Sequence, residues 1–185
     1  MPTLPVSDAR RTRFARPVAQ NGDMQLTARH EFADTCDRVY AMSIDPAFLA
    51  QTCVDLGGTD STEEILPDGG GATTRITARV APPPQMAKLV GASIPIEQTM
   101  TWGDASADGS RQARLSVRVV GFPVEMDADA RLAPTASGCA VDYEGTITVK
   151  IPVLGPVLEQ QAAPFILETL DNQQRAGDNW LAAHR

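Results

Sequence analysis

The chain has 185 residues, of which 43% are hydrophobic and 21% are charged, a composition typical of one globular domain. The formal net charge is −7, and the first 22 residues, with four Arg and one acid, contribute +3, so the remainder carries −10. This excess of acids argues against binding along a nucleic-acid backbone. No stretch approaches the roughly 20 apolar residues of a transmembrane helix, so none is expected.

The first 22 residues form a basic segment without periodic apolar positions. A secretory signal needs a continuous apolar region after its charges, and this segment has none. We expect either a disordered tail or a misassigned start, followed by a single domain at 23–185, with a cytoplasmic location. The alternative is a basic arm that touches an acidic partner or a membrane surface, so transient membrane contact stays open.

The cysteines are Cys36, Cys53 and Cys139, and the histidines are His30 and His184. An odd number of cysteines without close pairs does not describe a disulfide framework. A zinc site would need Cys pairs or nearby His residues, which this spacing does not offer. We therefore predict three buried, reduced thiols, no metal site and no cofactor.

The domain opens with a clear alternation over residues 24–32, which predicts a strand with one buried face. Asp34-Thr35 offers an N-cap for a short helix that continues to Met42. Asp45-Pro46 starts a second helix, because Pro is pre-set for the first helical position, and Gly57-Gly58 ends it.

A meander of antiparallel strands follows, separated by turns rich in Gly, Pro and Asp. The six expected strands cover residues 59–66, 72–80, 93–103, 111–120, 124–132 and 139–151. Three consecutive prolines at 82–84 stop the second of these strands, and residues 85–91 can form a turn or two of helix.

From Pro156 to the end the apolar period becomes helical, which predicts one long amphipathic helix. Its apolar stripe is formed by Leu158, Ala162, Phe165, Ile166, Leu170, Gln173, Gly177, Trp180 and Leu181. Pro164 lies inside this helix and should kink it or break one hydrogen bond.

The expected architecture is α+β, in the order β-α-α-β-β-β-β-β-β-α. A seven-stranded antiparallel sheet with one apolar face must cover that face, and the C-terminal helix is the only long cover. A curved sheet around one helix is not filled completely by the side chains of that helix. We therefore expect a cavity between sheet and helix, with the 85–91 loop near its mouth.

This element order resembles the helix-grip fold of the SRPBCC superfamily, which includes steroidogenic-acute-regulatory (START) lipid-transfer domains, polyketide cyclases and birch-pollen-allergen-like proteins. More narrowly, the chain is similar to an uncharacterised bacterial family, the domain of unknown function 2505. The match is carried by Arg29-His30-Glu31-Phe32, Val39-Tyr40-Ala41-Met42, Asp45-Pro46-Ala47-Phe48, Leu89-Val90-Gly91, 98–102, Val120-Gly121-Phe122-Pro123, 149–155 with Glu159, and Trp180-Leu181. The resemblance implies a fold and a class of apolar ligands, and no reaction.

The alternation gathers a mostly apolar set on the concave face, as a small-molecule pocket requires. The predicted ligand-binding residues are His30, Ile76, Ala78, Gln98, Met100, Trp102, Leu115, Val117, Met126, Tyr143, Phe165, Ile166 and Leu170. Leu26, Ala28, Ile96, Val141 and Ile147 share this face, and any of these side chains can instead simply fill a core. His30, Gln98 and Tyr143 are its polar exceptions, and each must find a partner when buried.

No catalytic constellation stands out. Glu63-Glu64, Asp127 with Asp129, and Asp142 with Glu144 fall at loops or on the outer phase, where solvated surface charge is expected. Nucleophile elbows, phosphate-binding loops and His-x-x-x-His pairs are absent from the sequence. We predict a protein that binds or carries a lipid, isoprenoid or polyketide. The alternatives are a cyclase or dehydratase that uses His30 and Tyr143, and a protein-interaction module. The sequence does not determine the oligomeric state.

Overall fold

The computed structural model of the chain describes residues 19–20, 23–82, 87, 91–150 and 155–185. For 19, 20, 23 and 155–167 it describes the backbone alone. Most of the 85–91 segment lies outside the described residues. Within the described part, no helix is long and apolar enough to cross a membrane.

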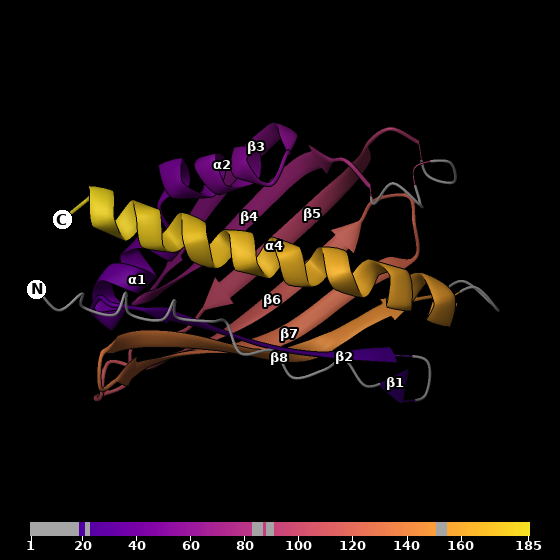
Figure 1. Ribbon diagram of the computed structural model, residues 1–185. Coiled ribbons are helices and arrows are strands. Elements are labelled where there is room, and N and C mark those ends of the chain that lie inside the picture. The colour runs from indigo at the N-terminus through magenta and orange to yellow at the C-terminus, as the bar shows by residue number, and fades with distance from the viewer. Residues whose placement is uncertain (1–18, 21–22, 83–86, 88–90, 151–154) are drawn as a thin grey trace, which may run out of the picture.

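The predicted order of elements is confirmed, with one short strand added at the start (Figure 1). The elements are β1 (Ala19–Gln20), β2 (Asp23–Phe32), α1 (Cys36–Ser43), α2 (Pro46–Asp55), β3 (Thr59–Asp68), β4 (Gly71–Val80), β5 (Ile94–Trp102), β6 (Arg111–Val119), β7 (Val124–Thr135), β8 (Gly138–Val149) and α4 (Gly155–Ala183). Strand β1 pairs with the start of β2, so strand pairing reaches into the segment expected to be a tail. Helix α4 continues through Pro164.

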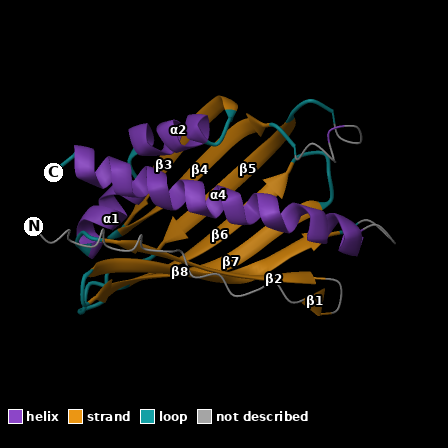
Figure 2. Ribbon diagram, in the orientation of Figure 1, coloured by secondary structure: helices purple, strands orange, loops and turns teal. Residues whose placement is uncertain are grey.

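One antiparallel sheet holds all these strands, in the order β1-β2-β8-β7-β6-β5-β4-β3. The seven predicted strands are its long strands. The sheet curves around α4, which crosses the concave side, while α1 and α2 close the end near the C-terminus (Figure 2). Gly145 permits this shape where β8 passes β7, since a Cβ there would lie 2.2 Å from the Asp127 carbonyl oxygen. Only glycine fits at that position.

Both short helices begin at the residues that the sequence indicated. The Thr35 hydroxyl accepts a hydrogen bond from the Arg38 amide at the start of α1. The Asp45 carboxylate accepts from the amides of Ala47 and Phe48 at the start of α2, with Pro46 in the first turn. Each cap supplies an acceptor to amides that have no partner inside the helix, which fixes where the helix begins.

Helix α4 contacts the sheet through a stripe formed by Leu170, Gln174, Gly177 and Leu181, all buried. Gly177 lets the helix approach β2 closely, because a Cβ there would lie 2.6 Å from the Phe32 ring. The predicted stripe contained Gln173, which is only partly buried, in place of Gln174. Gln174 is polar, but it can be buried because its side chain hydrogen-bonds to the backbone of β2.

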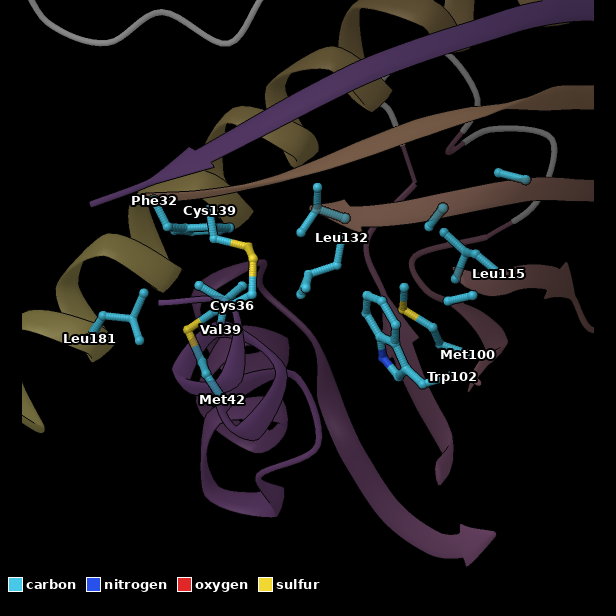
Figure 3. Packing of buried hydrophobic residues seen from close by; sticks show 14 residues of the cluster. Phe32, Cys36, Val39, Met42, Met100, Trp102, Leu115, Leu132, Cys139 and Leu181 are labelled. Carbon is cyan, nitrogen blue, oxygen red and sulfur yellow. A yellow bond between two sulfur atoms is a disulfide. The ribbon is translucent and has the colours of Figure 1, made fainter. Parts of the chain in front are cut away.

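The main core lies where α1 and the end of α4 meet the sheet (Figure 3). Here Cys36, at the start of α1, forms a disulfide with Cys139 of β8. The prediction of three buried, reduced thiols is therefore wrong, and the remaining thiol, Cys53, is only partly buried. The two partners are 103 residues apart in sequence, so nothing in their local spacing indicated the pair. A smaller cluster, Met24, Leu26, Ala28, Ile147 and Leu170, joins β2 and β8 to the middle of α4.

Candidate ligand site between the sheet and helix α4

The strand register places the predicted sheet residues on one face. Ile76, Gln98, Val117 and Met126 form one row across β4, β5, β6 and β7. Met100 and Leu115 belong to the next row, and a third row contains both Trp102 and Tyr143. Ala78 lies one row to the other side, opposite Ile96. His30 pairs with Val141 on the same face.

This inner face changes in burial from one end to the other. Toward α1, the side chains of Met100, Trp102 and Leu115 are buried in the main core. Toward the opposite end, the row of Ile76, Gln98, Val117 and Met126 is only partly buried. Within the described residues, the backbone of α4 packs mainly against β2, β8, α1 and α2. The partly buried row thus lies on the part of the sheet that curves away from those contacts.

His30 is the most deeply buried polar group of the site, with 3% of its surface exposed. Its Nε2 has no hydrogen-bond partner, and the backbone of Leu170 on α4 lies beside the ring. Burial lowers the pKa of the imidazole to about 4, against the weaker opposing effects of the Leu170 backbone and of Asp171. An unsatisfied buried acceptor costs about 1–3 kcal/mol. His30 is therefore neutral near pH 7 and carries an unfilled hydrogen-bonding position.

Tyr143 packs edge-to-face against His30, with 5.3 Å between ring centroids. Burial raises the pKa of its phenol to about 12, so this group too is neutral near pH 7. The site thus joins two neutral groups, each able to form hydrogen bonds without carrying charge.

Trp102 is buried and meets Tyr40 of α1 edge-to-face at 5.9 Å, with its indole Nε1 unpartnered. The Arg111 guanidinium lies 3.7 Å from the centre of the Tyr40 ring. Trp102 belongs to the main core, and the row of Met100 and Leu115 separates it from the partly buried row.

Glu63 is a residue of this face that the sequence assigned to the outside. The register pairs it with Ile76, so it extends the row of Gln98 and Val117 onto the edge strand β3. Its Oε1 is buried without a hydrogen-bond partner. The β3–β4 register is regular from Thr62 to Asp68, so Glu63 and Glu64 face opposite sides of the sheet. Its neighbour Glu64 does face outward, where it pairs with Arg75 at 3.3 Å.

The other predicted surface acids lie on the outer face, as expected. Asp142 accepts two hydrogen bonds from Arg29, and Asp127 accepts two from Arg118. Asp129 pairs with Arg114 at 3.3 Å. The described residues contain no group of three or more His, Cys, Asp or Glu side chains placed to hold a metal ion. These carboxylates form cross-strand ion pairs and do not approach His30 or Tyr143.

Two open hollows on the surface are formed by described residues. One, of about 600 Å³, lies beside Cys36, Asp108 and the β7–β8 turn. The other, of about 640 Å³, lies on the outer side of β2, β8 and β7, among charged side chains that include Arg131 and Glu144. Neither is the expected site. Leu170 is buried on α4 as predicted, whereas the side chains of Phe165 and Ile166 lie outside the described residues.

Comparison with known proteins connects this geometry to a family and a fold. The model of a family described as "Protein of unknown function (DUF2505)" matches residues 16–181. No curated protein matches the chain in sequence.

Solved structures share the fold at low identity. A STAR-related lipid transfer protein fragment from Xanthomonas axonopodis has a TM-score of 0.58 and 15% identity, covering 92% of this chain and 98% of that one. Human STARD10 has a TM-score of 0.56 and 9% identity, covering 94% and 76%. The di-domain ARO/CYC StfQ of the steffimycin pathway has a TM-score of 0.58 and 12% identity, covering 88% and 52%. The expected helix-grip architecture is thereby confirmed.

Proposed function

Because the chain belongs to the DUF2505 family, whose description states no activity, we propose from the geometry that it binds and carries a hydrophobic small molecule between the sheet and α4. The observation that carries the proposal is the row of Ile76, Gln98, Val117 and Met126. These inner-face residues are mostly apolar yet only partly buried. A ligand that covered them would gain about 25 cal/mol for each Å² of apolar surface removed from water.

The polar groups around this row support the proposal. Pockets for small molecules are apolar with a few polar groups that orient the ligand. Gln98 lies within the row, and Glu63, whose Oε1 is buried without a hydrogen-bond partner, extends the row onto β3. Two of the proteins that share the fold carry the words STAR-related lipid transfer and ARO/CYC in their names, which is consistent with an apolar ligand class.

A matched pair of variants tests this site. Val117→Trp fills the partly buried row, whereas Val120→Trp makes the same change at a side chain that is 43% exposed beyond β6. We expect the wild type and Val120→Trp to bind N-phenyl-1-naphthylamine saturably, and Val117→Trp to bind it roughly tenfold more weakly. Circular dichroism would verify that all three proteins are folded.

Native mass spectrometry of the purified protein complements that titration, because a co-purifying lipid or polyketide would identify the cargo. Equal affinity of the two variants would place any binding elsewhere. Absence of saturable binding to the wild type would overturn the carrier proposal and favour the protein-interaction module.

An enzyme remains the second candidate because His30 and Tyr143 lie together on the inner face. A cyclase or dehydratase would use them as proton-handling groups. Their pKa values of about 4 and about 12 make His30 a weak base and Tyr143 a weak acid near pH 7, which favours binding over proton transfer. Turnover of an added polyketide-like substrate, lost in His30→Gln while binding is retained, would reverse this preference.

A cytoplasmic location is part of the proposal, and the Cys36–Cys139 disulfide is its most direct test. Reducing compartments rarely maintain disulfides, although Cys139 is completely buried and shielded from thiols. Labelling of free thiols in intact cells, combined with cell fractionation, would show whether the pair is oxidised and in which compartment the protein lies. A fully oxidised pair in a non-cytoplasmic fraction would show the location to be wrong.

A further inference from the structure

Glu63 places a carboxylate at the β3 end of the row proposed to hold the ligand. Strand β3 pairs it with Ile76, which lies opposite Gln98 on β5. Its Oε1 is buried and has no hydrogen-bond partner. Burying a polar oxygen without a donor is costly, and burying a charged group without a partner costs more. This carboxylate therefore lacks the partner that its burial requires.

Other partly buried acids of the sheet do have such a partner. On the strands, three further acids with described side chains are partly buried, namely Glu125, Asp127 and Asp142. Arg29 and Arg118 on the outer face form ion pairs with all three. None of the described basic side chains forms an ion pair with Glu63. The exception is thus the acid that faces the proposed ligand site.

The surroundings of Glu63 supply no positive charge. Its neighbours along the row are Ile76 and Gln98. On the side of α2, burial raises the pKa of the Cys53 thiol, a hydrogen bond with Ser61 opposes this, and the charge of Glu63 adds to the rise. Helix α2 packs against β3 (Figure 1), so the carboxylate lies where α2 borders the row.

The row is accessible at this end. Ile65, which follows Glu63 on the same face of β3, is only partly buried, and so are Ile76 and Gln98. Glu63 itself is also only partly buried. Solvent therefore reaches the residues around the carboxylate, in contrast to the main core around Trp102. A ligand that lies along the row can bring one end to Glu63.

We propose that the hydrophobic ligand bears a protonated amine, which pairs with the Glu63 carboxylate. This inference rests on the proposed function and specifies the chemistry of its ligand. An ammonium group both donates hydrogen bonds to a carboxylate and compensates its charge. A hydroxyl group donates but leaves the charge uncompensated, and a second carboxylate would repel the first. The net charge of −7 also favours the approach of a cation.

Three ligands with one chain length test the idea: decylamine, 1-decanol and decanoate. Each competes against N-phenyl-1-naphthylamine on the wild type, Glu63→Gln and Glu64→Gln. Glu64 is the matched control, because it faces outward and pairs with Arg75, so its replacement removes the same formal charge from the other face. We expect decylamine to bind the wild type roughly tenfold more tightly than decanol. Glu63→Gln should lose this preference, and Glu64→Gln should keep it.

NMR of the wild type with decylamine gives a second readout that does not depend on the variants. The methylene group beside the amine should show nuclear Overhauser contacts with the Ile76 methyl groups or the Gln98 amide. Contacts of this methylene only with residues outside the row would overturn the amine inference alone. Equal affinity for decylamine and decanol, or a preference that survives in folded Glu63→Gln, would do the same. Failure of all three compounds and of the fluorescent probe to bind would overturn the proposed function, and the inference with it.

Discussion

The buried imidazole of His30 makes stability depend on pH. Its pKa is about 4 in the folded protein, against an ordinary value of 6.5. Between these values the unfolded chain binds a proton that the folded chain does not, so stability is fully present above pH 6.5 and falls as the pH approaches 4. We expect the free energy of unfolding to drop by about 2 kcal/mol between pH 7 and pH 5 because of this residue.

Urea unfolding of the wild type and His30→Gln at both pH values measures this term. The carboxylates are common to both proteins, so the difference between their pH dependences isolates the histidine. Identical dependences would mean that the imidazole charges without penalty in the folded state.

At the residue scale, alternation placed most inner-face side chains correctly, His30 and Tyr143 among them. It was not applied at Glu63, which was assigned to the outside together with Glu64, although adjacent residues of a strand face opposite sides. It also gave no sign that His30 is tied to Leu170, a contact between residues 140 positions apart. Periodicity reports the face of an element, whereas partners across the fold depend on how elements dock.

At the scale of elements, one side chain fastens α4 to the edge of β2. The Gln174 amide oxygen accepts from the Glu31 amide at 2.8 Å, and its nitrogen donates to the Glu31 carbonyl at 2.9 Å. Glu31 lies beyond the residues of β2 that pair with β1. The two bonds to Gln174 therefore take the place of backbone hydrogen bonds to a neighbouring strand. Gln174→Leu should cost about 2 kcal/mol of unfolding free energy, because the strand edge loses both partners beneath a helix.

The neighbouring Gln173→Leu is the matched control, since Gln173 is only partly buried on the same helix. Chemical denaturation compares the two, and amide exchange at Glu31 should accelerate only in Gln174→Leu. Equal stabilities would mean that the bonds to Glu31 contribute nothing net.

Element boundaries could be predicted where local chemistry sets them. The caps of α1 and α2 depend on Thr35 and Asp45, which act on amides two or three residues away. The β7–β8 hairpin was predicted too short, because Pro134 suggested a turn. Pro134 instead pairs with Cys139, so β7 continues to Thr135 and β8 begins at Gly138. Proline is tolerated there because it lies near the end of the strand, where one missing amide costs little of the ladder.

At the scale of the whole molecule, the order of amphipathic elements was enough to predict a sheet wrapped around one helix. The extent of the space between them was not predictable, because it depends on sheet curvature. Gly145 contributes to that curvature through a close approach that sequence alone does not reveal. The partly buried row that carries the proposed function is therefore a property of the assembled fold.

The Cys36–Cys139 disulfide should contribute strongly to the stability of this assembly. It joins α1 to β8 across 103 residues of sequence, and closing a loop of that size destabilises the unfolded chain by roughly 5 kcal/mol. Reduction should therefore lower the melting temperature by about 10 °C, and Cys36→Ala with Cys139→Ala should reproduce most of that loss without reductant. Cys53→Ala is the control, because its thiol is unpaired, and this variant should respond to reductant as the wild type does.

Titration of three free thiols in the denatured, unreduced wild type would show that the pair is not oxidised. The α1 end of the core would then be held by side-chain packing alone, in which Phe32, Val39 and Leu181 take part.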